Sequence, residues 1–170
     1  MSDPLLSRNL FSPPVKLSFK DAAAALILLD DGRYLMQLRD DKPGIFYPDH
    51  WGLFGGAIED GEDAETALRR ELREELGYDT GPVTYFTKMD FGFDSIGASR
   101  SVRVFYEVAM KASDLEGLVL TEGSAFEAVA VGDLLINRRI VPYDSFAIWL
   151  HHHWRNRVWD DESRQPNPIS

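Results

Sequence analysis

Cysteine is absent from this chain of 170 residues. Disulfide bonds, zinc–thiolate sites and cysteine nucleophiles are therefore all excluded. Long apolar runs are absent too, because no stretch approaches the roughly 20 residues that are needed to cross a bilayer. The first residues, from Met1 to Pro4, lack a basic region followed by an apolar run, so they indicate no targeting signal. We therefore expect a cytoplasmic protein that has no membrane partner.

Positive charge is scarce. The chain has 18 basic against 28 acidic residues, which leaves a formal net charge of -10 at neutral pH. The long-range field of such a protein repels polyanions, so duplex nucleic acid is disfavoured as a partner. An acidic protein still acts on phosphate compounds where divalent cations neutralise its carboxylates.

The length and composition predict one globular domain. Hydrophobic residues make up 44% of the chain and charged residues 27%, as in ordinary soluble proteins. Residues 1–20 contain three prolines and predict an extended lead-in, residues 21–160 form the expected domain, and the polar, proline-containing residues 161–170 predict a loose tail. The sequence leaves the oligomeric state open, a homodimer included.

Local patterns predict a mixed α and β fold. Two short apolar runs flank the turn Asp30–Asp31–Gly32, which is typical of a β-hairpin. Apolar residues at helical spacing precede Gly77, which indicates the end of a helix. The expected elements are strands 22–29 and 34–38, a short strand 51–54, a helix 63–76, strands 83–93, 102–110 and 126–131, and a closing helix 142–154.

An acidic residue interrupts the apolar face of the expected helix 63–76. At about 100° per residue, Glu75 projects between Ala64 and Leu68. Glu71 and Glu74 lie at the edge of the same stripe, so three carboxylates converge and repel one another. Hard oxygen ligands suit Mg²⁺ or Mn²⁺, which also bind phosphate oxygens.

A solvated acidic helix face is the ordinary interpretation of such a glutamate-rich segment. Two features favour a metal site instead. One is the apolar position of Glu75, and the other is the pair Gly55–Gly56 before the helix. Glycine lets the backbone approach a ligand closely, and a carbonyl there adds an uncharged ligand.

The segment 56–78, GAIEDGEDAETALRRELREELGY, resembles the Nudix box G-x5-E-x7-R-E-U-x-E-E-x-G-U, where U is a bulky aliphatic residue. Only the last position departs, because Tyr78 replaces an aliphatic residue at a packing position. The resemblance implies an α+β fold, in which a mixed β-sheet is sandwiched between α-helices. The resemblance rests on eight matching positions, which are Gly56, Glu62, Arg70, Glu71, Leu72, Glu74, Glu75 and Gly77.

The resemblance implies a role for most of these residues. Glu71, Glu74 and Glu75 are expected to bind the metal, together with the carbonyl of Gly55. A supporting ion pair between Glu62 and Arg70 is expected to orient the carboxylates. Without the box, the same pair would be an ordinary surface ion pair that contributes under about 1 kcal/mol.

Residues outside the box are assigned from weaker resemblances. Glu122 is similar to a late-loop carboxylate that acts in catalysis in family members, although Glu127 and an ordinary loop acid are alternatives. Arg39 resembles a residue that meets substrate phosphates, or is a surface arginine. Asp144 falls where some members read the base of a nucleotide, or it caps the closing helix.

Histidines and aromatic residues near the C-terminus receive structural interpretations. His151, His152 and His153 diverge by about 100° at each step, so they cannot share one metal ion, and we expect them to be partly exposed helix residues. The aromatic side chains in the same helix are expected to pack against the domain rather than to stack on a base. These are Phe146, Trp149 and Trp154.

The resemblance implies a magnesium-dependent hydrolase that cuts a phosphoanhydride bond in a nucleoside diphosphate linked to a further group. Glu122, or an acid of the helix such as Glu71, is expected to accept the proton of the attacking water. The substrate stays open among a sugar nucleotide, a compound of the adenosine diphosphate ribose type and an oxidised nucleoside triphosphate. A non-catalytic Nudix ligand sensor is the alternative, whereas the isomerases of this fold use a cysteine that this chain lacks.

Overall fold

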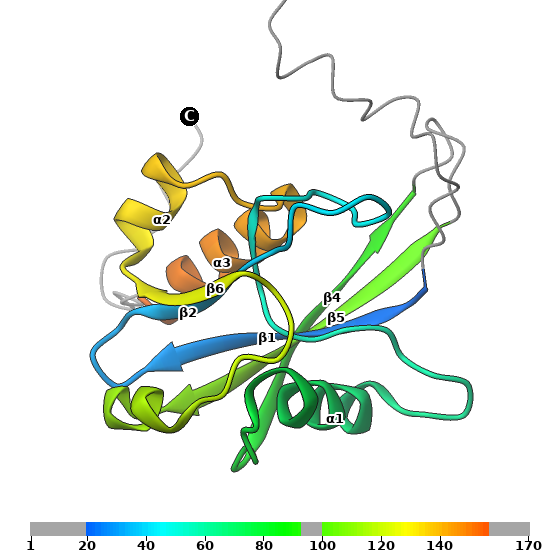
Figure 1. Cartoon of the computed structure of the whole chain (residues 1–170), viewed down its shortest axis with the longest axis horizontal. Coiled ribbons are helices and arrows are strands. Elements are labelled where there is room, and N and C mark those ends of the chain that lie inside the picture. The colour runs from blue at the N-terminus through cyan, green and yellow to red at the C-terminus, as the bar shows by residue number, and fades with distance from the viewer. Residues whose placement is uncertain (1–19, 93–99, 157–170) are drawn as a thin grey trace, which may run out of the picture.

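The computed structural model describes residues 20–92 and 100–156. The predictions of a lead-in over residues 1–20 and of a tail over residues 161–170 therefore lie outside the described residues, apart from Lys20. Within the described part of the chain, six strands form one mixed sheet in the order β3-β2-β1-β5-β4, and β6 pairs with β2. The predicted α+β fold with a mixed sheet is confirmed (Figure 1).

Two long strands form the centre of the sheet. β1 (Ala22–Leu29) runs parallel to β5 (Ser101–Met110) along its whole length. β1 also forms the predicted hairpin with β2 (Tyr34–Leu38), and Gly32 in the turn has a φ of 86°. β4 (Val83–Phe91) pairs antiparallel with β5, and the short β3 (Trp51–Gly52) pairs with β2.

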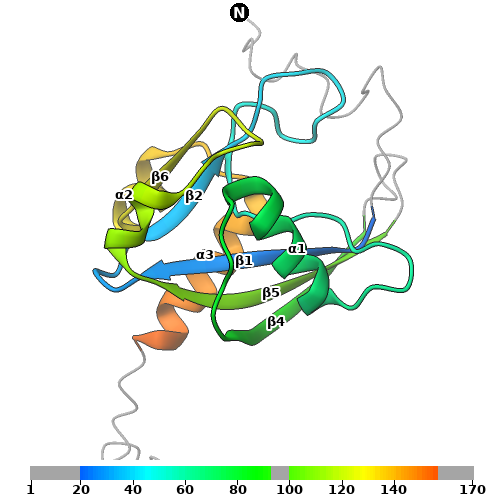
Figure 2. The same cartoon turned by 60° about the horizontal axis from the view of Figure 1, so that its bottom comes forward.

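Helices cover both faces of the sheet, as Figures 1 and 2 show. Successive side chains of a strand point to opposite faces, and β1 follows this rule. Ala25 and Ile27 pack with the apolar residues of α1 (Ala64–Leu76), whereas Ala24 and Leu26 pack with α2 (Val131–Asn137) and α3 (Pro142–Arg155). β1 is buried on both sides, which explains its continuous apolar run.

The helix α1 forms where the sequence predicts it. Its N-cap residue Asp63 accepts a hydrogen bond from the backbone N–H of Thr66 at 2.9 Å. Gly77 ends the helix with a φ of 62°, a left-handed conformation that favours glycine. Tyr78, which departs from the box, lies partly buried against the core and fills the packing position.

The second half of the chain departs from the predictions in two places. The strand predicted over residues 126–131 is β6 (Ala125–Val129), and the helix α2 (Val131–Asn137) follows it directly. A 3₁₀ helix, Ala112–Gly117, was not predicted either. The closing helix α3 (Pro142–Arg155) agrees with the prediction and carries proline in its first turn. None of the helices in the described ranges has the length and apolar character needed to span a bilayer.

Candidate functional site

The carboxylates of α1 meet the backbone of the Gly55–Gly56 segment. Glu75 is only 5% exposed, and its Oε2 accepts a hydrogen bond from the N–H of Gly55 at 2.9 Å. A Cβ atom at Gly56 would lie 2.4 Å from Cδ of Glu71, so only glycine leaves room for that carboxylate. Gly55 has a φ of 120°, and a Cβ there would lie 2.3 Å from the carbonyl oxygen of Ala23. The glycine pair therefore brings the loop directly onto the acids.

Burial and mutual repulsion both act on these acids. Burial raises the pKa of Glu75 to about 7, and the negative charges of Glu122 and Glu71 act in the same direction, against the hydrogen bonds from Gly55 and Gln37. The pKa of Glu71 is also raised, mainly by burial, although Arg70 opposes that shift. These carboxylates are held close together without enough positive charge to compensate them.

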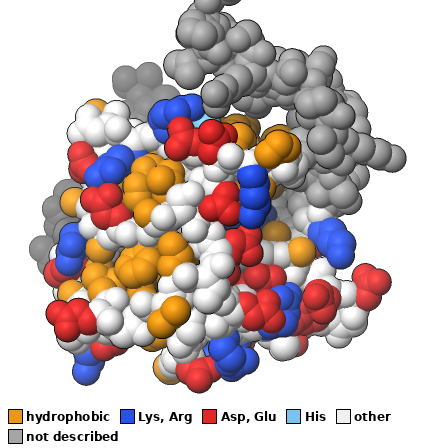
Figure 3. Space-filling view, in the orientation of Figure 1, with side chains coloured by type: hydrophobic (Ala, Val, Ile, Leu, Met, Phe, Trp, Pro, Cys, Tyr) orange, Lys and Arg blue, Asp and Glu red, His pale blue; other side chains and the backbone are white. Residues whose placement is uncertain are grey.

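Arg70 is the cation that lies nearest to the acidic cluster. Its Nε and Nη2 donate to the two carboxylate oxygens of Glu62, each at 3.1 Å, and Nη2 also donates to the carbonyl of Ala57. Its Nη1 donates to Glu71 at 2.8 Å and to Glu74 at 3.3 Å. The structure thus joins the predicted Glu62–Arg70 pair and links it to two of the three predicted metal-binding acids. Figure 3 shows acidic side chains gathered over α1 and the loop before it.

Glu122 reaches the cluster because its loop is attached to the end of α1. The N–H of Thr121 donates to the carbonyl of Glu75 at 2.9 Å. On the other side, Gln37 Nε2 donates to the carbonyl of Glu122 at 2.9 Å and to Oε1 of Glu75 at 3.3 Å. Gly123 has a φ of 85°, and a Cβ there would lie 2.8 Å from the side chain of Gln37. These contacts place Glu122 beside Glu75.

Glu127, the alternative to Glu122, lies elsewhere. It belongs to β6, and its Oε1 accepts a hydrogen bond from Arg138 at 2.9 Å. Glu127 does not line the cavity that Glu75 and Glu122 share. On position alone, the structure favours Glu122 for a part in the chemistry.

A cavity of about 540 Å³ opens beside the acids. Gly55, Gly56, Glu75 and Glu122 form one wall, and Arg39 contributes a cation. Nε of Arg39 donates to the carbonyl of Phe46 at 3.0 Å, which holds this side chain along the cavity. The lining also includes Gln37, a lysine, a second arginine and three aromatic side chains, namely Lys20, Arg103, Phe46, Phe91 and Tyr143. The arrangement places carboxylates, guanidinium groups and aromatic rings around one space.

As the side chains stand, no three histidine, aspartate or glutamate residues within the described ranges are grouped to hold one ion. The contacts explain this, because Arg70 engages Glu71 and Glu74 while Glu75 faces the N–H of Gly55. The donor chemistry nevertheless fits Mg²⁺, since hard carboxylate oxygens converge and repel one another. A divalent cation would compete with the guanidinium of Arg70 for the same oxygens.

Asp144 does not line this cavity. It is 1% exposed, and its Oδ2 accepts a hydrogen bond from the N–H of Leu53 at 3.0 Å. It does not act as the N-cap of α3, which is Val141. Burial raises the pKa of Asp144, while Arg103 and the N–H of Leu53 oppose that shift. The structure therefore places Asp144 behind the cavity wall, next to Arg103.

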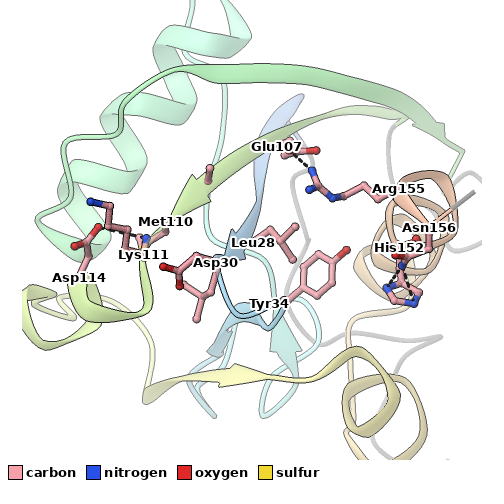
Figure 4. Close-up of a pocket in the computed structure, with 13 residues that line it drawn as sticks. Leu28, Asp30, Tyr34, Glu107, Met110, Lys111, Asp114, His152, Arg155 and Asn156 are labelled. Carbon is pink, nitrogen blue, oxygen red and sulfur yellow. Dashed lines mark hydrogen bonds and ion pairs between the residues drawn. The ribbon is translucent and has the colours of Figure 1, made fainter.

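A second cavity, of about 650 Å³, lies at the other end of β1 and β5 (Figure 4). His151 lies close to it and is fully buried, so the expectation of a partly exposed residue is wrong. Its Nδ1 is 2.7 Å from the hydroxyl of Tyr34, and its Nε2 is 2.8 Å from Oε2 of Glu107. Arg155 donates to the other oxygen of Glu107 at 2.5 Å. The acids of α1 do not line this cavity.

The aromatic residues of α3 are also placed differently from the expectation. Phe146 is 52% exposed, Trp149 is 44% exposed and Trp154 is 57% exposed. The rings of Phe146 and Trp149 stack on each other with their centroids 6.1 Å apart. The prediction that these side chains pack against the domain is therefore wrong.

Comparison with known proteins identifies the family. The family model for the NUDIX domain matches residues 18–157. The chain belongs to the Nudix family. The segment 56–78 is thus a genuine Nudix box, and the resemblance drawn from the sequence is confirmed.

Individual relatives agree with this assignment. Nucleoside triphosphatase NudI of Escherichia coli O139:H28 is 51% identical over 51 residues, which are 30% of this chain and 36% of the relative. The chain thus matches only about a third of the length of such curated relatives.

Solved structures show the same fold. The MutT protein of Methanosarcina mazei Go1 superposes with a TM-score of 0.69 at 16% identity, over 84% of this chain and 99% of that one. The NUDIX domain of Shewanella oneidensis NrtR, solved with ADP ribose, has a TM-score of 0.65 at 17% identity, over 89% and 96%. At these identities the structural likeness shows the Nudix fold alone.

Several residues of this Nudix site were missed in the sequence. Gln37 bridges Glu75 and Glu122, and its signal was a polar residue inside a short apolar strand. Arg103 lines the cavity from a strand read only for its apolar residues. Gly123 lets the loop of Glu122 approach Gln37 and Leu38 of β2 closely, and no local sequence pattern indicates this contact.

Proposed function

We propose that the chain is a Mg²⁺-dependent Nudix hydrolase that cuts a phosphoanhydride bond in a nucleoside diphosphate linked to a further group. One observation carries this proposal. Glu75 is buried beside Glu71 and Glu122 at the edge of the cavity of about 540 Å³. Acidic and aromatic side chains both line this cavity, as binding of a nucleotide requires. Carboxylates held against their own repulsion are typical of a divalent cation site.

The box residues would hold the ion. Glu71, Glu74 and Glu75 supply carboxylate oxygens, and the carbonyl of Gly55 is an uncharged candidate from the same cavity wall. When bound, Mg²⁺, or Mn²⁺ in its place, supplies neutralisation of the diphosphate and activation of a water molecule. Glu62 and Arg70 orient the acids through their paired hydrogen bonds.

The chain's own residues would carry the proton and position the substrate. Water attacks one phosphorus, a new P–O bond forms, and the P–O bond of the anhydride breaks and releases a phosphate group. Glu122 accepts the proton of that water, and Glu71 is the alternative acceptor. Arg39, which lines the same cavity, contacts the phosphates.

The relatives narrow the substrate class without deciding it. The partial match to a nucleoside triphosphatase supports a nucleoside triphosphate, and the NrtR domain solved with ADP ribose supports a nucleoside diphosphate sugar. The alternative is a non-catalytic ligand sensor of the same fold. The intact box acids and the placement of Glu122 favour hydrolysis.

A release assay tests the proposal. The full chain is incubated with Mg²⁺ and a panel of nucleoside triphosphates, oxidised nucleoside triphosphates, ADP-ribose and sugar nucleotides, and the release of phosphate, pyrophosphate or nucleoside monophosphate is measured. We expect turnover of at least one class, which disappears with EDTA and in Glu75→Gln. A panel that binds but is never hydrolysed would support the sensor instead.

A further inference from the structure

The cavity that Glu75 and Glu122 border is also lined by a buried cation. Arg103 lies in β5, where its register partner on β1 is Ala22. Its side chain is only 14% exposed, yet it lines the cavity that Glu75 and Glu122 border. A guanidinium is strongly desolvated at such a position, so its donors need partners.

Asp144, which does not line the cavity, forms an ion pair with this guanidinium. The ion pair joins Arg103 Nε and Asp144 Oδ1 at 3.4 Å, while the other oxygen of Asp144 is bound by the N–H of Leu53. The guanidinium carbon also lies 4.9 Å from the centre of the Tyr143 ring, within reach of a cation–π interaction. Its orientation is therefore set on two sides.

The pair is incompletely satisfied within the described residues. Neither Arg103 Nε nor Asp144 Oδ1 has a hydrogen-bond partner in that part of the chain, although both atoms are buried. Buried polar groups of this kind are rare. The two atoms face each other in the ion pair at 3.4 Å, so they hold the guanidinium against Asp144 and are not themselves the atoms that a ligand would reach. The guanidinium faces the cavity, whereas Asp144, at 1% exposure, does not.

We infer that Arg103 is the specificity-determining residue for the base of the nucleotide, and that Asp144 is a positioning residue that aims it. This inference rests on the proposed function, because it takes the substrate to be a nucleotide whose phosphates lie at the box acids. It moves base recognition from Asp144, as the sequence suggested, to the side chain that reaches the cavity.

The chemistry of a guanidinium selects one class of base. Arginine donates two parallel hydrogen bonds and accepts none, so it matches an edge that presents two adjacent acceptors. Guanine presents O6 and N7 in this way, whereas adenine places an amino donor at the position of O6. The cavity, which Phe46 and Phe91 also line, should therefore prefer guanine nucleotides.

Binding of non-hydrolysable analogues tests this preference independently of catalysis. The probes are the α,β-methylene diphosphates of guanosine and adenosine, titrated into the full chain with Mg²⁺ by calorimetry. We expect the guanosine analogue to bind at least about tenfold more tightly, the discrimination of one bidentate pair. Equal binding, or a preference for the adenosine analogue, would overturn the inference.

Two substitutions separate geometry from charge. Arg103→Lys keeps a cation beside Asp144, so the protein should fold, but it removes the planar fork. We expect the preference to fall to about twofold or less in this variant and in Arg103→Gln, with thermal melts confirming that the samples are folded. Arg33→Gln changes an arginine at the β1–β2 turn and should leave the preference intact.

Asp144→Asn tests the positioning role. We expect KM for guanosine triphosphate to rise by about tenfold with little change in KM for adenosine triphosphate, because only the aimed guanidinium distinguishes them. If Arg103→Lys keeps the full preference, Arg103 does not read the base. If the analogues show the preference but no nucleotide is hydrolysed, the proposed hydrolase function fails while the base site stands.

Discussion

Two glutamates at opposite ends of the molecule, the buried Glu75 of α1 and the partly buried Glu107 of β5, have pKa values shifted in opposite directions. At the Nudix end, burial raises the pKa of Glu75, and the negative charges of Glu122 and Glu71 act in the same direction. At the far end, burial also acts on Glu107, but hydrogen bonds from His151 and Arg155 outweigh it and lower its pKa. Two things differ between the sites: Glu75 is buried more deeply than Glu107, and its charged neighbours are acids, whereas those of Glu107 are His151 and Arg155.

The two cavities differ in the same way. The larger cavity, of about 650 Å³, lies beside a chain of satisfied groups that runs from Tyr34 through His151 and Glu107 to Arg155. The smaller one, of about 540 Å³, lies beside acids that repel one another and an arginine that lacks a complete set of partners. The uncompensated charge of the acids, rather than the volume of the cavity, therefore indicates that the cavity beside the Nudix box is the one that binds a ligand.

The largest effect is expected from removing the charge of Glu75. We expect Glu75→Gln to lower kcat on the order of ten thousandfold, or about 5 kcal/mol of barrier, because the metal loses its most buried carboxylate. The melting temperature should stay the same or rise, since one member of a repelling cluster is neutral. Glu107→Gln is the matched control and should lower the melting temperature while turnover per folded molecule persists.

Glu122→Gln tests whether the late loop supplies the proton acceptor. We expect kcat to fall by roughly 10² to 10⁴, while Mg²⁺ affinity stays within about threefold of the wild-type value. Glu127→Gln is the control, because its carboxylate faces Arg138, and it should change the barrier by well under about 1 kcal/mol. Near wild-type turnover of Glu122→Gln at saturating Mg²⁺ would direct the search to Glu71.

A smaller effect is expected from Arg70→Ala. Arg70 orients Glu62, Glu71 and Glu74 through hydrogen bonds, so its loss should lower kcat by about 10-fold to 100-fold. The melting temperature should change little, because all these side chains are partly solvated. A large drop in melting temperature with normal turnover per folded molecule would show that Arg70 only stabilises the fold.

Changes at His151 and Glu107, at the far end of the sheet, should alter the pH dependence of stability rather than the turnover. Burial lowers the pKa of His151 from 6.5, and the pKa of Glu107 is lowered from 4.5, so the unfolded chain takes up protons that the folded chain excludes. His151 lowers stability as the pH falls below about 6.5, because the unfolded chain binds its proton there, and the stability that Glu107 contributes is lost only as the pH falls below about 4.5. Glu75, whose pKa is raised to about 7, contributes a slope of the opposite sign in this range. The contribution of His151 is therefore the difference between wild type and His151→Gln in denaturant unfolding, which should reach up to about 1.4 kcal/mol per pH unit near pH 6.

His151→Gln sharpens that measurement. Gln cannot titrate, so this variant should lose the part of the slope near pH 6 while remaining able to hydrogen-bond Tyr34. An unchanged slope in His151→Gln would mean that another group is responsible.

The sequence predicted the parts of the molecule that depend on local patterns. The hairpin of β1 and β2 follows from a turn between two apolar runs, and α1 follows from its periodicity, its N-cap Asp63 and its terminal Gly77. The short helix α2 was missed because it directly follows β6 and has no side-chain cap. The burial of His151 was missed because its partners are 117 and 44 positions away in the chain.

In the candidate site, too, the residues that share a local motif were predicted, and those brought together by long-range packing were not. The box acids and Arg70 lie within a single motif, so their spacing on one helix was sufficient to place them together. Arg103 and Gln37 come from strands that meet the helix only in the folded protein. Asp144 was identified as a residue of interest, but its position behind Arg103 depends on how α3 packs against β3 and β5.

The central claim is that uncompensated carboxylates at the Nudix end bind a divalent cation, and calorimetric titration with Mg²⁺ tests it most directly. Wild type, Glu75→Gln and Glu107→Gln are titrated under identical conditions, with Mn²⁺ as a second probe. The account predicts binding by wild type and Glu107→Gln, and affinity lower by at least about tenfold in Glu75→Gln. Binding by Glu75→Gln that is as tight as that of the wild type would contradict it.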